Sequence, residues 1–149
     1  MATGEEVAMK IRSLQESDLD TVAQLYVKAY KEHHAEETIE TARPYLEKFF
    51  RFEPEGCFVA DDEGTICGAI LAYSYQKFGR PVLFLQELFV DPEGRHKGIG
   101  RKLVAMLREG FATAAVKVVP LIKADTAVLN FYNSLGFEQD QVFSFGFDD

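Results

Sequence analysis

The chain has 149 residues, 47% of them hydrophobic and 13% aromatic, which predicts one globular domain over residues 1–149 with a core of its own. No apolar run approaches the ~20 residues of a membrane-spanning helix, and the first ten residues lack the basic and apolar regions of a secretory signal, so we expect a cytoplasmic protein. The formal net charge of −8 argues against a nucleic-acid binder, although acidity can also serve solubility alone.

The first third of the chain combines a strand with two amphipathic helices. Residues 7–14 alternate in polarity as a strand does, and residues 17–30 carry a helix cap followed by apolar positions at helical spacing. A second helix is predicted over residues 39–52. Its firm part should begin at Arg43 or Pro44, because proline fits best in a first helical turn.

Three strands follow these helices. Residues 57–60 and 65–75 are predicted to form a hairpin around a turn, and residues 82–90 form a largely buried central strand. Gly68, inside the hairpin's second strand, indicates a close approach of another segment or a bulge. The two cysteines, Cys57 and Cys67, belong to no CxxC pair, so we expect free thiols in the core.

The central strand is followed by a turn at residues 91–94 and by a helix that begins near Gly98. The first turn of a helix binds anions, because its N–H groups are unpaired and lie at the positive end of the helix dipole. Gly98 and Gly100 let the backbone approach an anion closely. Residues 91–125 hold seven Lys or Arg against four acidic residues, a charge of +3 that leaves −11 for the rest. We therefore predict a pyrophosphate ligand here.

The remaining residues predict a strand, a helix and a final strand. The strand covers residues 116–122, the helix covers residues 127–135 between a Thr126 cap and a closing Gly136, and residues 137–147 are strand-like. The whole order, βααβββαβαβ, predicts an α+β fold (an α/β sandwich) in which a mixed sheet carries helices on both faces.

The spacing of the glycines distinguishes between the known types of phosphate-binding loop. A P-loop would continue with Lys and a hydroxyl residue, but two basic residues follow Gly100, and the glycines do not match G-x-G-x-x-G. Instead, R-x-x-G-x-G at residues 95–100 resembles the acyl-coenzyme A binding motif of the GNAT superfamily of N-acetyltransferases. Residues 130–137, NFYNSLGF, are similar to the signature helix of the same family, which ends F-Y-x-x-x-G-F. An ordinary strand–turn–helix with packing glycines is the alternative.

The resemblance extends from Met9 to Phe147 and implies a fold, a reaction and a ligand. The sheet would be mostly antiparallel, with a splayed central strand pair that forms the CoA cleft. The reaction would be direct transfer of an acetyl group from acetyl-CoA, without a metal, to a primary amine. The residues that the resemblance assigns to CoA are Leu88, Phe89, Val90, Arg95, His96, Lys97, Gly98, Ile99, Gly100, Arg101 and Asp125. Asp125 stands where many relatives have Asn, so it cannot donate the equivalent hydrogen bond.

Two residues are expected to move protons. By resemblance, Tyr132 is the general acid that protonates the leaving thiolate, and a phenol is close enough in pKa to a thiol for this role. Glu87 is the candidate base, because a carboxylate in an apolar strand is costly unless it faces a wet cleft or has a partner. The alternatives are a half-buried core aromatic at Tyr132 and a structural or orienting acid at Glu87.

The acceptor is expected to be a small cationic amine or a peptide amine. The acidic residues at Glu32, Glu36, Glu37 and Glu40 lie where the family's substrate-side loop falls and would attract a cation, although a solvated acidic face is the alternative. The acceptor could instead be chosen by Tyr26, Tyr30 and Phe49. His33 and His34 read as a solvated helix end rather than metal ligands.

Two other functions stay open at this point. One is an acyl-CoA-binding sensor or interaction module without turnover, and the other is a transferase that uses a longer acyl group. Retained Glu87 and Tyr132 favour catalysis. Neither a nucleic-acid nor a membrane partner is expected, and a homodimer is compatible with these features.

Overall fold

The computed structural model describes residues 9–94, 98–119, 126–140 and 145–146. The chain divides into two compact units, residues 1–119 and 120–149. None of the described helices is long and apolar enough to cross a membrane. Cys57 and Cys67 are both buried free thiols, as predicted.

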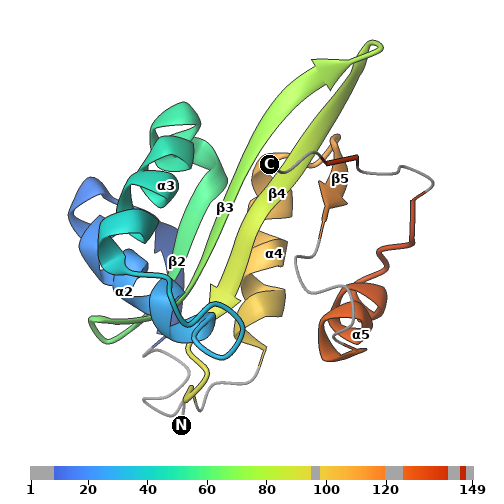
Figure 1. Ribbon diagram of the computed structural model, residues 1–149. Helices are drawn as coiled ribbons and strands as arrows, with labels where there is room; N and C mark the ends of the chain where they lie inside the picture. The colour runs from blue at the N-terminus through green and yellow to red at the C-terminus, as the bar shows by residue number, and fades with distance from the viewer. Residues whose placement is uncertain (1–8, 95–97, 120–125, 141–144, 147–149) are drawn as a thin grey trace, which may run out of the picture. The chain divides into compact units, whose positions relative to one another are not determined.

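The first unit is built on a five-stranded sheet, drawn in Figure 1, in which the strands lie in sequence order. Its strands are β1 (Met9–Ser13), β2 (Cys57–Asp62), β3 (Thr65–Lys77), β4 (Arg80–Val90) and β5 (Ala115–Val118). The first four pair antiparallel, and β4 pairs with β5 in parallel. The predicted mixed and mostly antiparallel sheet is therefore confirmed.

Helices cover both faces of this sheet (Figure 1). They are α2 (Leu19–Ala29), α3 (Ile39–Phe52) and α4 (Ile99–Gly110), with short 3₁₀ turns η1 (Glu16–Asp18) and η2 (Pro54–Gly56). The buried faces of α2 and α3 share one core cluster with Ala69 and Leu71 of β3. Consecutive residues of a strand face opposite sides of the sheet, so Gly68 lies on the side opposite to Ala69. There it contacts the Ile99 side chain of α4. The predicted close approach at Gly68 is thus a strand-to-helix contact.

The start of α3 corrects the prediction drawn from Pro44. The helix begins at Ile39, and Pro44 lies inside it. Thr38 caps the helix by accepting a hydrogen bond from the Thr41 N–H at 3.4 Å, while the Thr38 N–H donates back to the Thr41 hydroxyl at 3.2 Å. This reciprocal cap stabilises the helix start at Ile39. The helix therefore forms before Pro44 and continues through it, although the proline has no N–H and one backbone hydrogen bond is lost there.

The hairpin strands are longer than predicted, because their turns are tighter. Positive φ angles occur at Glu63 and Gly64 between β2 and β3, and at Phe78 and Gly79 between β3 and β4. These two-residue turns leave the flanking residues free to pair. Pro81 therefore lies inside β4, next to the position where pairing with β5 begins.

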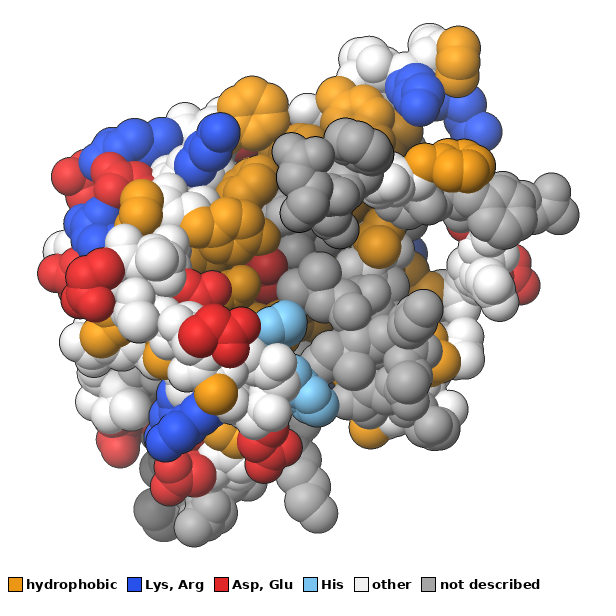
Figure 2. Space-filling model, in the orientation of Figure 1, with side chains coloured by type: hydrophobic (Ala, Val, Ile, Leu, Met, Phe, Trp, Pro, Cys, Tyr) orange, Lys and Arg blue, Asp and Glu red, His pale blue; other side chains and the backbone are white. Residues whose placement is uncertain are grey.

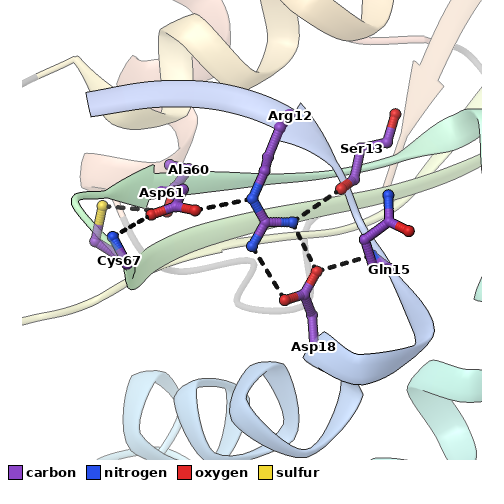
Figure 3. Close-up of polar contacts among 8 residues, drawn as sticks. Arg12, Ser13, Gln15, Asp18, Ala60, Asp61 and Cys67 are labelled. Atoms are coloured by element: carbon purple, nitrogen blue, oxygen red, sulfur yellow. Dashed lines mark hydrogen bonds and ion pairs between the residues drawn. The ribbon is translucent and has the colours of Figure 1, made fainter. Parts of the chain in front are cut away.

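Arg12 links β1 to two other parts of the first unit (Figure 3). Its guanidinium donates to both carboxylate oxygens of Asp18, at 2.8 and 3.0 Å, and to Asp61 at 2.8 Å. Asp61 also accepts the Gly64 N–H at 2.7 Å. The helix cap predicted at the start of residues 17–30 is not observed at Asp18, the residue before α2, because its carboxylate accepts from Arg12 and from the Gln15 N–H rather than from the first turn of α2.

The second unit contains one described helix, α5 (Thr126–Ser134), which ends before Gly136 at φ +92° as the sequence indicated. The predicted final strand is not observed at residues 137–140 or 145–146. Residues 141–144 and 147 of that prediction, and residues 120–122 of the predicted fifth strand, lie outside the described residues. The strand that ends the predicted element order is therefore wrong at the described residues, 137–140 and 145–146.

Candidate active site

The site is organised by an irregularity in β4. Leu71 of β3 lies opposite Glu87, but the next residue, Ala72, lies opposite Leu85, so Gln86 is an extra residue on β4. In a regular strand, consecutive side chains point to opposite faces. At this bulge Gln86 and Glu87 both reach toward α3, because both side chains bond to the same tyrosine, Tyr45.

Glu87 is buried, with 3% of its surface exposed, and both of its carboxylate oxygens are hydrogen-bonded. The Tyr30 hydroxyl donates to Oε1 at 3.0 Å, and the Tyr45 hydroxyl donates to Oε2 at 2.7 Å. The amide Nε2 of Gln86 donates to the Tyr45 oxygen at 2.9 Å. Three elements, α2, α3 and β4, thus converge on one carboxylate.

Burial and hydrogen bonding act on the acidity of these groups in opposite directions. Burial raises the pKa of Glu87, and the hydrogen bonds from Tyr45 and Tyr30 offset part of that rise. Burial also raises the pKa of Tyr45, and the charge of Glu87 adds to that rise. The Tyr45 phenol therefore remains a protonated donor, while the carboxylate has a stronger affinity for a proton than an exposed glutamate.

Aromatic rings enclose this carboxylate on the α2 and α3 side. The Tyr26 ring lies 4.8 Å from that of Tyr30, 5.3 Å from that of Phe89 and 5.9 Å from that of Tyr45. Figure 2 shows that hydrophobic and acidic side chains adjoin on this face of the molecule, with the histidines beside them. A carboxylate among rings is poorly solvated, which strengthens its interaction with an incoming cation.

The acidic segment at residues 32–40, which ends in the first turn of α3, is not uniform. Three of its glutamates, Glu32, Glu36 and Glu40, are exposed, whereas Glu37 is half-buried and accepts a hydrogen bond from the Thr41 hydroxyl. The charge of Glu37 contributes to the raised pKa of Tyr26, after burial and Glu87. Glu37 is therefore the member of this segment with an electrostatic connection to the Glu87 cluster.

Beyond Leu85, one edge of β4 is left without a described partner strand. The pairing with β5 ends at Leu85 and Val118, and the described residues of β5 stop there. The Asp91 N–H bonds to the Cys67 carbonyl at 2.9 Å, so by alternation the Phe89 N–H also faces β3. The N–H groups of Leu88 and Val90 face the opposite edge. The register therefore favours these two, rather than Phe89, as donors to a ligand.

The beginning of α4 has the features that suit a phosphate. Gly98 precedes the helix with φ +82°, and among the described residues no side chain caps the first turn. Chain neighbours aside, no atom of the described residues lies within 4 Å of a Cβ built at Gly98. The first helical hydrogen bond runs from the Lys102 N–H to the Gly98 carbonyl at 2.9 Å, so the N–H groups of Ile99 and Gly100 have no partner within α4 itself. An anion therefore fits this helix end.

Several predicted site residues are not brought together by the described structure. Tyr132 lies on α5 in the second unit, half-buried, with its ring 5.1 Å from Phe131 and 5.3 Å from Phe137. Arg95, His96, Lys97 and Asp125 lie outside the described residues. Among the described residues, no group of His, Cys, Asp or Glu is arranged to hold a metal ion.

The sequence reasoning missed the roles of Tyr45 and Gln86. Tyr45 occurs in the predicted apolar face of residues 39–52, where it reads as a core aromatic. Gln86 interrupts an apolar strand next to Glu87, and that pair of adjacent polar residues was the available signal for a bulge. Tyr30 was named only as an aromatic on the acceptor side.

Comparison with known proteins identifies similar sequences. Residues 19–137 match the family model described as Acetyltransferase (GNAT) family. An uncharacterised N-acetyltransferase of Methanocaldococcus jannaschii is 29% identical over 141 residues, which cover 89% of this chain and 62% of that protein. This chain therefore spans less than two thirds of the length of that relative.

Two solved structures have a similar fold. The aminoglycoside N-acetyltransferase AAC(6′)-Iy, in complex with CoA, has a TM-score of 0.73 at 21% identity, with 94% of each chain covered. An aminoglycoside acetyltransferase from an uncultured soil metagenomic sample, in complex with sisomicin, has a TM-score of 0.72 at 24% identity, with 96% of this chain and 97% of that chain covered.

Proposed function

This chain belongs to the acetyltransferase (GNAT) family of acyltransferases, and we propose that it transfers an acetyl group from acetyl-CoA to a primary amine in one step. The amine nitrogen attacks the thioester carbonyl carbon, a C–N bond forms, the C–S bond breaks and the CoA sulfur leaves as a thiolate. The observation that carries the proposal is the buried Glu87 carboxylate, held by two phenols beside the edge of β4 that has no described partner strand beyond Leu85.

Glu87 is the proposed base. An amine that arrives as an ammonium must lose a proton before or during attack, and a carboxylate oxygen of Glu87 takes that proton directly or through one water. Its burial supports the role, because a carboxylate with a raised pKa is a stronger base than an exposed one. Each oxygen accepts one phenolic hydrogen bond and keeps a further lone pair for the incoming proton.

Tyr132 is the proposed acid. Its phenol would donate a proton to the thiolate sulfur, which balances the proton taken from the amine. The support is the NFYNSLGF sequence at residues 130–137 and the half-buried ring on α5. A phenol with an ordinary pKa of about 10 can share a proton with an alkyl thiol.

The CoA-binding residues belong to the same proposal. The N–H groups of Leu88 and Val90 would bond the pantetheine or the thioester carbonyl, and the N–H groups of Gly98, Ile99 and Gly100 would bond the pyrophosphate. Three of the predicted cations, Arg95, His96 when protonated and Lys97, would add charge, and Asp125 would stand near the pantetheine.

We propose a small cationic amine as the acceptor and a cytoplasmic setting for the reaction. The support is the negative charge of Glu37 and of Glu87, together with the aromatic rings of Tyr26, Tyr30 and Tyr45 beside Glu87, which favour a cation by charge and by contact with ring faces. The comparison structure bound to sisomicin belongs to an enzyme named for an amine-bearing sugar class, which agrees with this choice.

A direct test incubates the protein with acetyl-CoA and a panel of polyamines, amino-sugars, peptide amines and anionic amino acids. Thiol release and the mass of the acetylated product are followed together. Acetylation of cationic amines in preference to anionic ones is expected. Binding of acetyl-CoA without any acetylated product would favour the sensor alternative, and faster reaction with a longer acyl-CoA would favour the alternative donor.

The electrostatic part of the proposal has its own test. The variant in which Glu32, Glu36, Glu37 and Glu40 are all changed to Gln should lower kcat/KM for the best cationic acceptor at low salt, and the parent should approach the variant at high salt. Glu37→Gln alone should account for most of the loss. Equal rates for parent and variant at low salt would contradict the electrostatic account and favour selection by the aromatic residues.

A further inference from the structure

We infer that Tyr45, held by Gln86, is a positioning residue that fixes the Glu87 carboxylate for proton transfer. The hydrogen-bond arrangement itself is independent of the reaction, whereas the catalytic part of the inference rests on the proposed function. Tyr45 does not touch the reacting atoms in this account. It acts through Glu87, and Gln86 acts through Tyr45.

The three side chains form a chain of hydrogen bonds with one direction. The Gln86 amide nitrogen can only donate, and it donates to the Tyr45 oxygen at 2.9 Å. The single proton of the Tyr45 hydroxyl is therefore directed to Oε2 of Glu87, at 2.7 Å. A phenol that accepts one hydrogen bond becomes a stronger donor in the next. Gln86 should thus strengthen the bond that Tyr45 makes to the carboxylate.

The bulge in β4 makes this chain geometrically possible. Without the extra residue, Gln86 and Glu87 would point to opposite faces of the sheet, and one tyrosine could not bond to both. The register shift occurs at these residues, between Leu85 and Glu87. Bulges next to active sites commonly redirect a side chain in this way.

Tyr45 differs from the second donor, Tyr30, in its place in a helix and in the length of its bond to Glu87, although the rings of both contact Tyr26. Tyr45 lies in the middle of α3, with its ring 5.9 Å from that of Tyr26 and 5.3 Å from that of Phe49. Tyr30 is the residue that follows the last turn of α2, and its bond to Oε1 is longer, at 3.0 Å. The Tyr45 bond is therefore the one that sets the carboxylate's orientation.

The groups that face Glu87 can be named element by element. The α2 helix and its end contribute Tyr26 and Tyr30, and α3 contributes Tyr45. His34 lies against the Tyr30 ring at 6.2 Å, and Glu37 acts on Tyr26. On the β3 side the residue in register is the apolar Leu71. None of the salt bridges among the described residues involves Glu87, so its titration is governed mainly by burial and by the phenols.

The test uses four single variants: Tyr45→Phe, Gln86→Leu, Gln86→Glu and, as the matched control, Tyr73→Phe. Tyr73 belongs to the same row of rings, 5.9 Å from Phe49, whereas the described hydrogen bonds to the Glu87 carboxylate come from Tyr30 and Tyr45. The first readout is the pH profile of kcat/KM for the best amine. The second, which needs no activity, is the titration of the Glu87 carboxyl carbon followed by ¹³C NMR.

Tyr45→Phe removes a donor to the charged form of Glu87, so the pKa of Glu87 should rise. On the acid side of the profile, kcat/KM should fall on the order of 10-fold, with partial recovery as the pH rises. Gln86→Leu should give a smaller change in the same direction. Gln86→Glu should give a larger one, because a second carboxylate competes for the Tyr45 proton and repels the charge of Glu87.

A double-mutant cycle separates the proposed chain from general disturbance. The effect of Gln86→Leu should disappear in a Tyr45→Phe background and persist in a Tyr30→Phe background. A purely structural role would lower the melting temperature of the variants without moving the Glu87 titration. That outcome, or a Gln86→Leu effect that persists in the Tyr45→Phe background, would overturn the inference.

The failure of the inference and that of the proposed function are distinguishable. If the parent acetylates amines while Tyr45→Phe and Gln86→Leu leave the Glu87 titration and the acid limb like those of Tyr73→Phe, the inference is wrong and the function stands. If no amine is acetylated but the NMR titration shifts as predicted, the hydrogen-bond chain stands and its catalytic purpose is wrong.

Discussion

A Cβ atom at Gly68 would lie 2.8 Å from Cγ2 of Ile99, so the first residue of α4 packs directly on the bare backbone of β3. Ile99 is buried, and it immediately follows the left-handed Gly98 at the helix end that suits a phosphate. The position of the proposed pyrophosphate site is therefore set by a strand residue about thirty positions earlier in the sequence.

Gly68→Ala should disturb both stability and ligand binding. The added methyl group also lies 3.2 Å from Leu103 and Val90 side-chain atoms, so α4 must move. We expect the free energy of unfolding to fall by about 1–3 kcal/mol, and acetyl-CoA to bind more weakly, as measured by denaturant unfolding and calorimetry. Gly110→Ala, at the other end of α4 with nothing within 4 Å, should be neutral or slightly stabilising. Equal behaviour of the two variants would contradict the proposed role of this contact.

Gly98→Glu should abolish the rise in melting temperature that acetyl-CoA gives the parent. The added carboxylate would stand at the helix end and repel the pyrophosphate, and a left-handed backbone adds strain. Gly98→Asn is the control, because Asn tolerates this backbone conformation and carries no charge. If the shift with acetyl-CoA survives in Gly98→Glu, the phosphates bind elsewhere.

Tyr132→Phe should lower kcat on the order of 10–10⁴-fold, because the leaving thiolate would lose its proton donor. Acetyl-CoA affinity should change little, since the ring and its contacts with Phe131 and Phe137 are kept. Steady-state kinetics and calorimetry on the same preparation measure both quantities. Weaker binding at an unchanged kcat would make Tyr132 a packing residue.

Arg12→Met should reduce stability in a pH-dependent way. The hydrogen bond from Arg12 is the main cause that lowers the pKa of Asp18 and of Asp61, so the stabilisation is present above the ordinary carboxyl pKa and is lost as pH falls through the lowered values. At pH 7 we expect a loss of roughly 1–3 kcal/mol in unfolding free energy. The gap between parent and variant should close in acid.

Arg43→Met provides the comparison for this experiment. Arg43 pairs with Asp20 at 2.5 Å and with Glu47, and these carboxylate side chains are 73% and 27% exposed, against 12% and 11% for Asp18 and Asp61 beside Arg12. Exposed ion pairs contribute little to stability, so this variant should unfold much like the parent. A similar loss of unfolding free energy in both variants would mean that the burial of Asp18 and Asp61 does not strengthen their ion pairs with Arg12.

Much of the fold was predictable because it follows from local patterns. The apolar spacing of residues 19–30 and the turn glycines at positions 64 and 79 have direct physical causes, and the structure follows them. The start of α3 was mispredicted because a proline rule was weighed above the cap at Thr38, which side-chain hydrogen bonds supply.

The site was harder to predict, because its geometry depends on contacts between distant segments. Glu87 stood out as a charge in an apolar strand, but its partners Tyr30 and Tyr45 lie 57 and 42 positions away. Neither the register shift at Gln86 nor the direction of the Leu88 and Val90 N–H groups follows from hydrophobic periodicity. The reacting groups could be proposed from the sequence. The hydrogen bonds and the strand register that hold them could be seen only in the folded structure.

Glu87 is proposed to accept the proton of the amine, and the pH profile of Glu87→Gln is the decisive test of that role. In the parent, kcat/KM should rise with pH as Glu87 loses its proton, through a pKa that burial raises. Glu87→Gln should lower kcat on the order of 10²–10⁴-fold and remove that acid limb. Glu53→Gln, which alters a carboxylate that instead bonds Ser74, should retain both. A Glu87→Gln enzyme with the rate and acid limb of the parent would contradict the account.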